Sequence, residues 1–198
     1  MKLLLLLLMG GLLSGCLITR TPGFYSGYKR LTPAEQTQIQ FVPPDSTIPA
    51  LGDRAIYAVA ARSLLQAMHS ADTTLVYLWG PRCHSQVCAS LQSVQAICHQ
   101  RGYRLYVVAE YYDMAQISLQ PPLQNPLLAV NQRFYQTDYC NKYTQLFSAE
   151  LRRGAPLPDS TRYARYYLFE GDRFVRAMNM LAAASPQFPS LQPNPLGK

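Results

Sequence analysis

The sequence has 198 residues, 48% of them hydrophobic and 15% charged, and a formal net charge of +7 at pH 7. This length and apolar content are sufficient for one domain with a buried core. No internal repeat is present, and the basic residues are scattered along the chain. A repeat array and a dedicated nucleic-acid-binding helix are therefore excluded.

The chain begins with the features of a secretory signal: Lys2, an apolar run at residues 3–9, and small residues before Cys16. The apolar run is too short to cross a bilayer as a helix, which needs roughly 20 residues. We therefore predict that residues 1–15 form a signal peptide.

The end of this signal, Leu13-Ser14-Gly15-Cys16, resembles the lipobox of bacterial lipoproteins. The resemblance implies cleavage before Cys16 and attachment of palmitate and further acyl chains there, which together anchor a protein in a membrane. Leu17 stands where an Asp would imply retention in the inner membrane, and residues 17–22 lack an acidic cluster for surface export. The resemblance thus implies the outer membrane, facing the periplasm. The alternative is an ordinary signal in which the cysteine stands by chance.

A cell-envelope location determines which bonds and partners are expected. The compartment is oxidising and permits disulfides. The expected partners are the membrane, through the lipid on Cys16, and other envelope proteins, but not nucleic acid. Four cysteines besides Cys16 allow three complete pairings, which the sequence does not distinguish: Cys83, Cys88, Cys98 and Cys140.

The first half of the mature chain is predicted to lead from a tether into alternating elements. Residues 16–50 are expected to be a lipidated tether and N-terminal extension, with residues 17–27 as the tether itself. Capping and hydrophobic patterning then predict a short helix capped by Thr32 with Pro33 at its first position, a strand at 56–59, a helix at 63–70 and a buried strand at 74–79.

The second half continues the alternation and ends in a hairpin. The predicted elements are a helix at 85–100, a strand at 103–112, a short helix at 113–118, a helix at 131–153, hairpin strands at 163–169 and 173–178, and a short helix at 179–184. Residues 185–198 contain four prolines and are expected to form a disordered tail.

The order β-α-β-α-β-α-β-β predicts an α/β sandwich, because strands separated by helices pair in parallel and the hairpin adds an antiparallel edge. We expect a central mixed sheet of about four to five strands, flanked by helices, in a domain covering residues 51–184.

A candidate reactive cysteine follows the predicted strand at 74–79, in the segment Trp79-Gly80-Pro81-Arg82-Cys83. If the next helix begins near residue 85, Cys83 lies at its positive end, which stabilises a thiolate. Arg82 and His84 flank the cysteine and shift its pKa in the same direction. The pattern predicts a reactive thiol at Cys83.

This segment, the helix after it and the closing hairpin resemble the thioredoxin family over about residues 56–181. The resemblance implies a thioredoxin-like fold with Cys83 as the first active-site cysteine, and Trp79, Pro81, Arg82 and His84 as binding or positioning residues. Three family features are replaced, namely the second cysteine by Gln86, the buried acid by Tyr77 and the cis-proline by Ala164.

Cys88 is the candidate partner for Cys83. On an ideal helix, residues five apart have Cα atoms about 8.7 Å apart, whereas a disulfide needs roughly 7 Å or less. The two cysteines therefore pair only if Cys83 lies outside the helix or its first turn unwinds. One branch of the peroxiredoxins uses the same spacing, but Gly80 and Val76 stand where those enzymes have Thr or Ser and Pro.

The remaining cysteines and the acidic residues near the end of the strand at 103–112 are interpreted as structural or solvated rather than functional. Cys98 lies on an apolar helix stripe and is expected to be a small buried hydrophobe, with a Cys98–Cys140 bridge as the alternative. No metal or cofactor is expected, because Cys83, His84 and Cys88 meet a metal only after local distortion. Glu110 and Asp113 are interpreted as part of a solvated loop.

Two functions remain open at this point, with a peroxiredoxin-like peroxidase as a lesser third. The first is an atypical thiol–disulfide oxidoreductase, in which Cys83 attacks and Cys88 resolves. The second is a non-catalytic thioredoxin-fold scaffold, in which a Cys83–Cys88 disulfide is structural.

Overall fold

The computed structural model describes residues 21–49, 56–70, 73–85 and 87–181. The signal peptide, Cys16 and the C-terminal tail expected from the sequence lie outside these ranges. Within them, no helix combines the length and hydropathy needed to cross a membrane.

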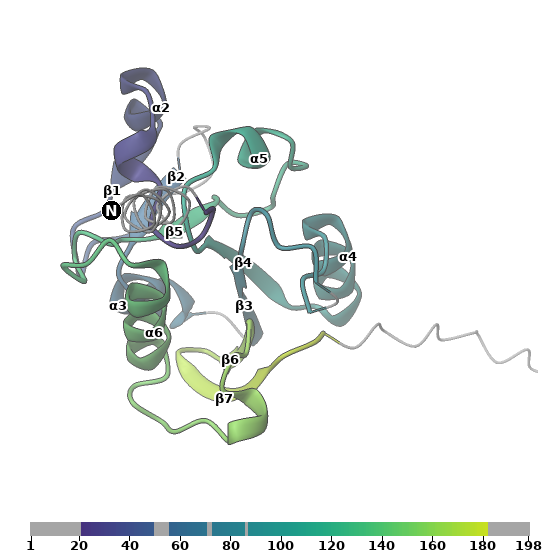
Figure 1. The fold of residues 1–198 in the computed structure, drawn as a ribbon. Helices are drawn as coiled ribbons and strands as arrows, with labels where there is room; N and C mark the ends of the chain where they lie inside the picture. Colours follow the sequence, from purple (N-terminus) through teal and green to yellow (C-terminus); the bar gives the residue numbers. More distant parts are fainter. Residues whose placement is uncertain (1–20, 50–55, 71–72, 86, 182–198) are drawn as a thin grey trace, which may run out of the picture.

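A seven-stranded mixed sheet forms the centre of the molecule (Figure 1). Its spatial order is β1-β2-β5-β4-β3-β6-β7. The first five strands pair in parallel, β6 pairs antiparallel with β3, and β7 pairs antiparallel with β6. The strands are β1 (Ile39–Phe41), β2 (Ile56–Val59), β3 (Thr73–Trp79), β4 (Arg104–Ala109), β5 (Leu128–Val130), β6 (Tyr166–Glu170) and β7 (Arg173–Met178).

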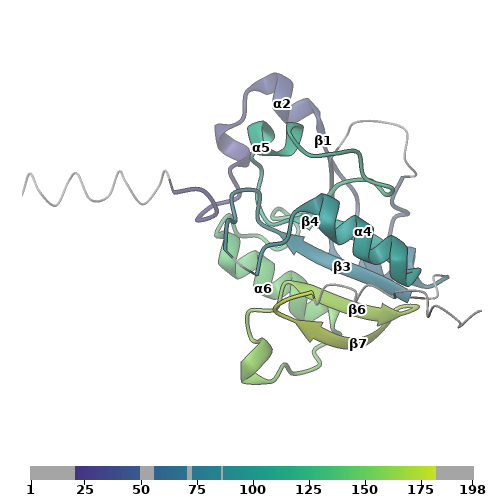
Figure 2. The same ribbon diagram turned by 90° about the vertical axis from the view of Figure 1, so that its right-hand side faces the viewer.

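Helices cover both faces of this sheet, as Figures 1 and 2 show. Packed on one face are α3 (Ala61–Met68) and α6 (Cys140–Leu151), and on the other α4 (Leu91–Arg101). Alternate residues of β3 feed the two cores, with Val76 and Leu78 on the α6 side and Tyr77 on the α4 side. The predicted α/β sandwich with a mixed sheet is confirmed.

The predicted number of strands, four to five, is wrong, because two strands of three residues each carry little pattern. One is β1, and the other is β5, which is buried throughout and inserts between β2 and β4. A fully buried three-residue segment shows neither alternation nor helical spacing. Such a segment becomes a strand because of the strands that pair with it, which for β5 are β2 and β4.

Several helix boundaries also differ from the prediction. The remaining short elements are η1 (Tyr28–Arg30), α2 (Pro33–Thr37), α5 (Met114–Ser118) and η2 (Asp159–Thr161). Thr32 caps α2 in a capping box with Glu35, as the sequence indicates. In contrast, residues 131–139, with turns at 132–136, are not helical and precede α6, and residues 179–181 are not helical either.

The helix predicted from residue 85 begins six residues later, at Leu91. Ser90 is its cap, and its hydroxyl accepts a hydrogen bond from the Ser93 backbone N–H at 3.1 Å. A capping serine starts a helix more strongly than an apolar stripe, because it satisfies a free backbone donor. Residues 80–85 and 87–90 therefore belong to a loop between β3 and α4.

Candidate functional site

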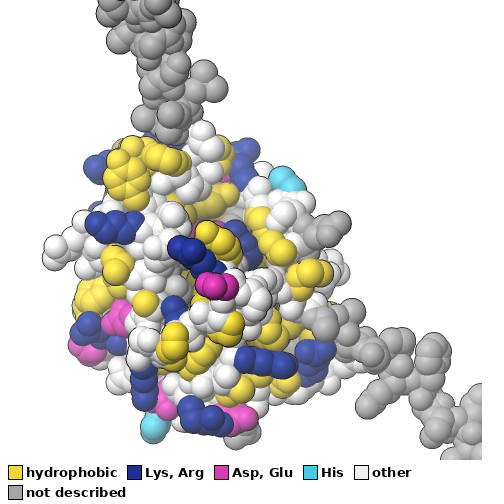
Figure 3. Space-filling model, turned by 60° about the horizontal axis from the view of Figure 1, so that its bottom comes forward, with side chains coloured by type: hydrophobic (Ala, Val, Ile, Leu, Met, Phe, Trp, Pro, Cys, Tyr) yellow, Lys and Arg dark blue, Asp and Glu magenta, His cyan; other side chains and the backbone are white. Residues whose placement is uncertain are grey.

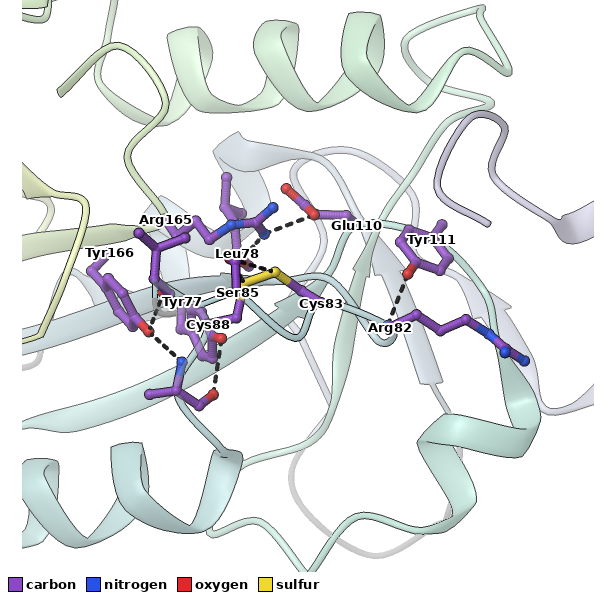
Figure 4. The surroundings of a disulfide bond; sticks show 12 residues. Tyr77, Leu78, Arg82, Cys83, Ser85, Cys88, Glu110, Tyr111, Arg165 and Tyr166 are labelled. Atoms are coloured by element: carbon purple, nitrogen blue, oxygen red, sulfur yellow. Dashed lines mark hydrogen bonds and ion pairs between the residues drawn. A yellow bond between two sulfur atoms is a disulfide. The ribbon is translucent and has the colours of Figure 1, made fainter. Parts of the chain in front are cut away.

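The loop after β3 carries a disulfide between Cys83 and Cys88, whose Cα atoms are 5.9 Å apart (Figure 4). Both cysteines are half-buried and lie before the start of α4. The prediction that Cys83 stands at a helix N-terminus is therefore wrong. The geometric condition for pairing is met for the same reason, since neither cysteine is held by helical spacing.

Two tyrosines from neighbouring strands hold the Cys88 end of this loop. Tyr77 on β3 donates its hydroxyl proton to the Ala89 carbonyl at 3.0 Å, and Tyr166 on β6 donates to the Val87 carbonyl at 3.1 Å. The Ala89 backbone N–H donates back to the Tyr166 hydroxyl at 3.1 Å. The part of the loop around Cys88 is thus hydrogen-bonded to two neighbouring strands of the sheet, β3 and β6.

Arg82 does not face the disulfide. Its backbone N–H donates to the Tyr111 hydroxyl at 2.8 Å, and its guanidinium pairs with the Asp113 carboxylate, which raises the pKa of Arg82. Figure 4 shows the Arg82 side chain directed away from the two sulfur atoms. His84 is exposed, whereas Trp79 and Pro81 are buried.

A charged pair lies beside the disulfide loop. The Arg165 guanidinium donates to the Glu110 carboxylate at 2.9 Å, and the two side chains are 22% and 15% exposed. Arg165 also donates to the Leu78 carbonyl at 3.2 Å. The interpretation of Glu110 as a solvated loop residue is wrong. Burial raises the pKa of the Glu110 carboxyl, and the Arg165 guanidinium opposes this shift.

Gly80 shows how closely this pair approaches the cysteine. A Cβ atom on Gly80 would lie 3.0 Å from the Glu110 Oε2 atom, 3.4 Å from the Cys83 Cβ atom and 3.5 Å from the Arg165 guanidinium. The carboxylate, the guanidinium and Cys83 therefore surround one point of the backbone. A side chain at this position would require the Glu110 carboxylate to shift, because the added Cβ atom would be closer to it than an ordinary van der Waals contact.

The Ser85 hydroxyl lies beside both sulfur atoms of the disulfide. It is 3.3 Å from the Cys83 sulfur and 3.5 Å from the Cys88 sulfur. A hydroxyl rotates freely and is both a donor and an acceptor. It is able to donate to either sulfur when that sulfur is a thiolate.

The two remaining described cysteines are unpaired and buried, on opposite faces of the sheet. Cys98 belongs to the core beneath α4, as expected for a small buried hydrophobe, and Cys140 to the core beneath α6. The alternative of a Cys98–Cys140 bridge is wrong, because the sheet separates them. Burial raises the pKa of each thiol to about 11, so neither is reactive near neutral pH.

The described part of the chain brings no three His, Cys, Asp or Glu side chains together in the way that a metal ion needs. Basic side chains are distributed among acidic and hydrophobic ones on the face shown in Figure 3. This distribution agrees with the scattered basic residues of the sequence.

Comparison with protein-family models, curated proteins and solved structures finds no match to this chain. The site is therefore interpreted from its own geometry. Sequence reasoning identified Cys83 and Cys88 but missed Arg165, Tyr166 and the role of Glu110. The available signal was the position of Glu110 directly after a buried parallel strand, at the edge where sites gather in α/β sheets.

Proposed function

We propose that this protein is a lipid-anchored, thioredoxin-like oxidoreductase of the cell envelope that exchanges thiols and disulfides through Cys83 and Cys88. The observation that carries the proposal is the half-exposed disulfide on a loop at the end of a parallel strand, with the Glu110 carboxylate beside it. A structural cysteine pair has no need of a charged group in a mostly buried position nearby.

The exchange requires only the two cysteines and a substrate disulfide. The Cys83 thiolate attacks one substrate sulfur, forms a mixed disulfide and releases the other substrate sulfur as a thiolate. The Cys88 thiolate then attacks the Cys83 sulfur and releases the second substrate thiolate. The substrate gains two electrons, and the protein ends with the Cys83–Cys88 disulfide. The reverse sequence oxidises a substrate dithiol.

The neighbouring groups support proton transfer and thiolate stabilisation. We assign Glu110 as the acceptor of the proton that a cysteine thiol loses before it attacks, because its carboxylate and Cys83 both lie next to Gly80. Arg165 holds the carboxylate through their 2.9 Å contact. The Ser85 hydroxyl, within 3.5 Å of both sulfurs, stabilises whichever thiolate forms. These roles do not depend on a helix N-terminus.

A structural role for the disulfide is the second candidate, and a specific observation favours it. Tyr77, Tyr166 and Tyr111 fix the loop by hydrogen bonds to residues 82, 87 and 89. A loop held in this way keeps its shape and serves as a rigid binding surface, with the disulfide as a further constraint.

The reduction potential separates the two functions. The full-length lipoprotein in detergent is equilibrated across a glutathione series, and alkylated peptides containing Cys83 and Cys88 are quantified by mass spectrometry. A potential between about −270 and −120 mV supports exchange, whereas a value below about −300 mV contradicts it and supports the structural role.

Client trapping supplies an independent test. A Cys88→Ser variant should accumulate mixed disulfides through Cys83, because the resolving thiol is missing. The matched Cys83→Ser variant should accumulate few. Equal trapping by both variants would contradict the assignment of Cys83 as the attacking residue.

A further inference from the structure

Three aromatic rings form an exposed cluster where the described chain begins. Phe24, Tyr25 and Tyr139 contact one another, with ring centroids 4.9, 5.1 and 5.7 Å apart. Phe24 is 40% exposed and Tyr139 is 52% exposed. We call these three residues the aromatic cluster.

The backbone around the cluster is fixed to the domain rather than free as a tether. The Ser26 N–H donates to the Asp138 carbonyl at 3.0 Å, and the Cys140 N–H donates to the Phe24 carbonyl at 3.0 Å. Tyr25 and Tyr139 form a β-bridge. The part of the predicted tether that the structure describes is therefore docked against the start of α6.

This docked segment also reaches the disulfide loop. A Cβ atom on Gly23 would lie 3.0 Å from the Tyr111 ring, and the Tyr111 hydroxyl accepts the hydrogen bond from Arg82, next to Cys83. The aromatic cluster and the disulfide thus lie at the same end of the sheet, where the parallel strands β3 and β4 finish. Figure 2 shows the start of the described chain, in purple, and the turn between β6 and β7 at opposite ends of the sheet.

We propose that the aromatic cluster lies against the lipid surface and holds the disulfide-bearing edge of the domain toward the membrane. The proposal rests on the proposed lipid anchor at Cys16. Only residues 17–20 separate Cys16 from Thr21, so the lipid-carrying cysteine lies within at most about 18 Å of the docked chain.

The chemistry of the cluster suits a lipid interface. Tyrosine rings are favoured at the level of lipid headgroups, because the ring is apolar and the hydroxyl is polar. Exposed basic residues follow the cluster closely in sequence, Lys29 and Arg30 after Tyr25 and Lys142 after Tyr139. Lysine and arginine side chains are attracted to anionic headgroups.

Photo-crosslinking in native membranes tests the proposal with the full-length lipoprotein. Tyr139 is replaced by the photoreactive aromatic benzoylphenylalanine, and membranes labelled with radioactive phospholipid are irradiated. The control site is His69, whose side chain is 79% exposed and 3.6 Å from Asp172 in the turn between β6 and β7. We expect a phospholipid adduct at position 139 and none above background at position 69.

Two further measurements make each outcome decisive. The mass of the N-terminal peptide reports acylation of Cys16, and slow alkylation of Cys140 reports that the segment around Phe24 remains docked. An unacylated Cys16 contradicts the anchor. An acylated, docked protein without a lipid adduct at 139, or with equal adducts at 139 and 69, overturns the role of the aromatic cluster. A protein adduct alone at 139 overturns it as well and identifies a protein-binding surface.

Discussion

The rings of Tyr77 and Tyr166 stack with their centroids 4.5 Å apart and an angle of 14° between their planes. They are registered partners on antiparallel strands β3 and β6, so the stack is a direct cross-strand contact. Both rings are fully buried, and both hydroxyls end at the loop that carries Cys88. The stacked pair thus joins two neighbouring strands and fixes the loop through its hydroxyl groups.

Removing the Tyr166 hydroxyl should loosen this loop more than removing that of Tyr77. Tyr166→Phe leaves both the Val87 carbonyl and the Ala89 N–H without their partner, whereas Tyr77→Phe leaves only one carbonyl. We expect a loss of about 1–3 kcal/mol in the free energy of unfolding for Tyr166→Phe and about 1 kcal/mol for Tyr77→Phe. Urea unfolding measures both.

The matched control for these variants is Tyr163→Phe, because Tyr163 is 77% exposed. Its free energy of unfolding should change by less than about 0.5 kcal/mol. If Tyr166→Phe is no more destabilising than this control, the two backbone hydrogen bonds do not hold the loop.

Neutralising Glu110 should weaken both the fold and the exchange reaction. Glu110→Gln keeps the shape of the side chain but leaves the Arg165 guanidinium without a counter-charge in a mostly buried position. We expect a loss of about 2 kcal/mol in the free energy of unfolding, below the full cost of breaking a buried pair because both groups retain some contact with water. Exchange with a model disulfide should slow near neutral pH, because the proton acceptor is missing.

The exposed pair Glu170–Arg173 provides the comparison, since its side chains are 56% and 69% exposed. Glu170→Gln should cost about 0–1 kcal/mol and leave exchange unchanged. A Glu110→Gln variant that exchanges at the parent rate would show that the carboxylate has no part in the proposed reaction.

The substitution Gly27→Ala should detach residues 21–27 from the start of α6 and from Tyr112. Gly27 has a φ of 80°, and an added Cβ atom would lie 2.6 Å from the Tyr112 carbonyl oxygen. Gly102 has a φ of 67° with nothing within 4 Å of an added Cβ. We expect about 1–2 kcal/mol of destabilisation for Gly102→Ala from backbone strain alone, and a larger loss for Gly27→Ala.

The two glycine variants should also differ in the reactivity of Cys140, whose N–H is bound by the docked segment. Alkylation of Cys140 is expected to accelerate in Gly27→Ala and to remain slow in Gly102→Ala. Equal rates would mean that docking of residues 21–27 does not depend on the close approach at Gly27.

The buried thiol of Cys98 should make stability depend on pH in the alkaline range. Burial raises the pKa of Cys98 from an ordinary value of 9.0 to about 11. The unfolded chain therefore loses its thiol proton first, and the free energy of unfolding falls as the pH rises from about 9 to 11. The fall attributable to this thiol is about 2–3 kcal/mol for a shift of that size.

A Cys98→Ala variant isolates this contribution. Chemical unfolding of the parent and the variant is compared at intervals from pH 8 to 11, with the disulfide intact. Below pH 9 the parent should be more stable, because alanine leaves space in the core, and the difference should shrink as the pH rises. A difference that stays constant across the range would show that Cys98 ionises equally easily in the folded and unfolded chains.

Patterns that are complete within one segment were predicted correctly. Residues 74–79 are buried and rich in β-branched and aromatic side chains, so their strand is evident without knowledge of its neighbours. The same is true of the strand at 56–59, the second strand of the hairpin at 173–178 and the cap at Thr32. In each of these elements the decisive interactions are local, or the buried stretch is long enough to show a recognisable hydrophobic pattern in the sequence.

The features of the candidate site that depend on sequence neighbours were also predictable, whereas those that depend on distant residues were not. The turn after β3 and the spacing of Cys83 and Cys88 are legible in the sequence, because both concern neighbours along the chain. The predicted start of α4 at residue 85 is wrong. Val87 has the spacing of the apolar stripe of the helix, but the helix begins only at Leu91, after its cap Ser90. Tyr111 and Asp113 determine where Arg82 points, and they come from another part of the chain.

The α/β class, the hairpin and the two candidate cysteines can be inferred from the amino-acid sequence alone, as can the prediction of a lipidated leader, since each depends on a pattern within one short stretch. The folded chain is needed to show that β5 lies between β2 and β4, that Glu110 meets Arg165, and that residues 21–27 dock near the disulfide loop. These features depend on contacts between residues far apart in the chain, 55 positions for Glu110 and Arg165 and 112 positions for Ser26 and Asp138. No local propensity encodes such contacts, because their free energy exists only when the whole sheet has assembled.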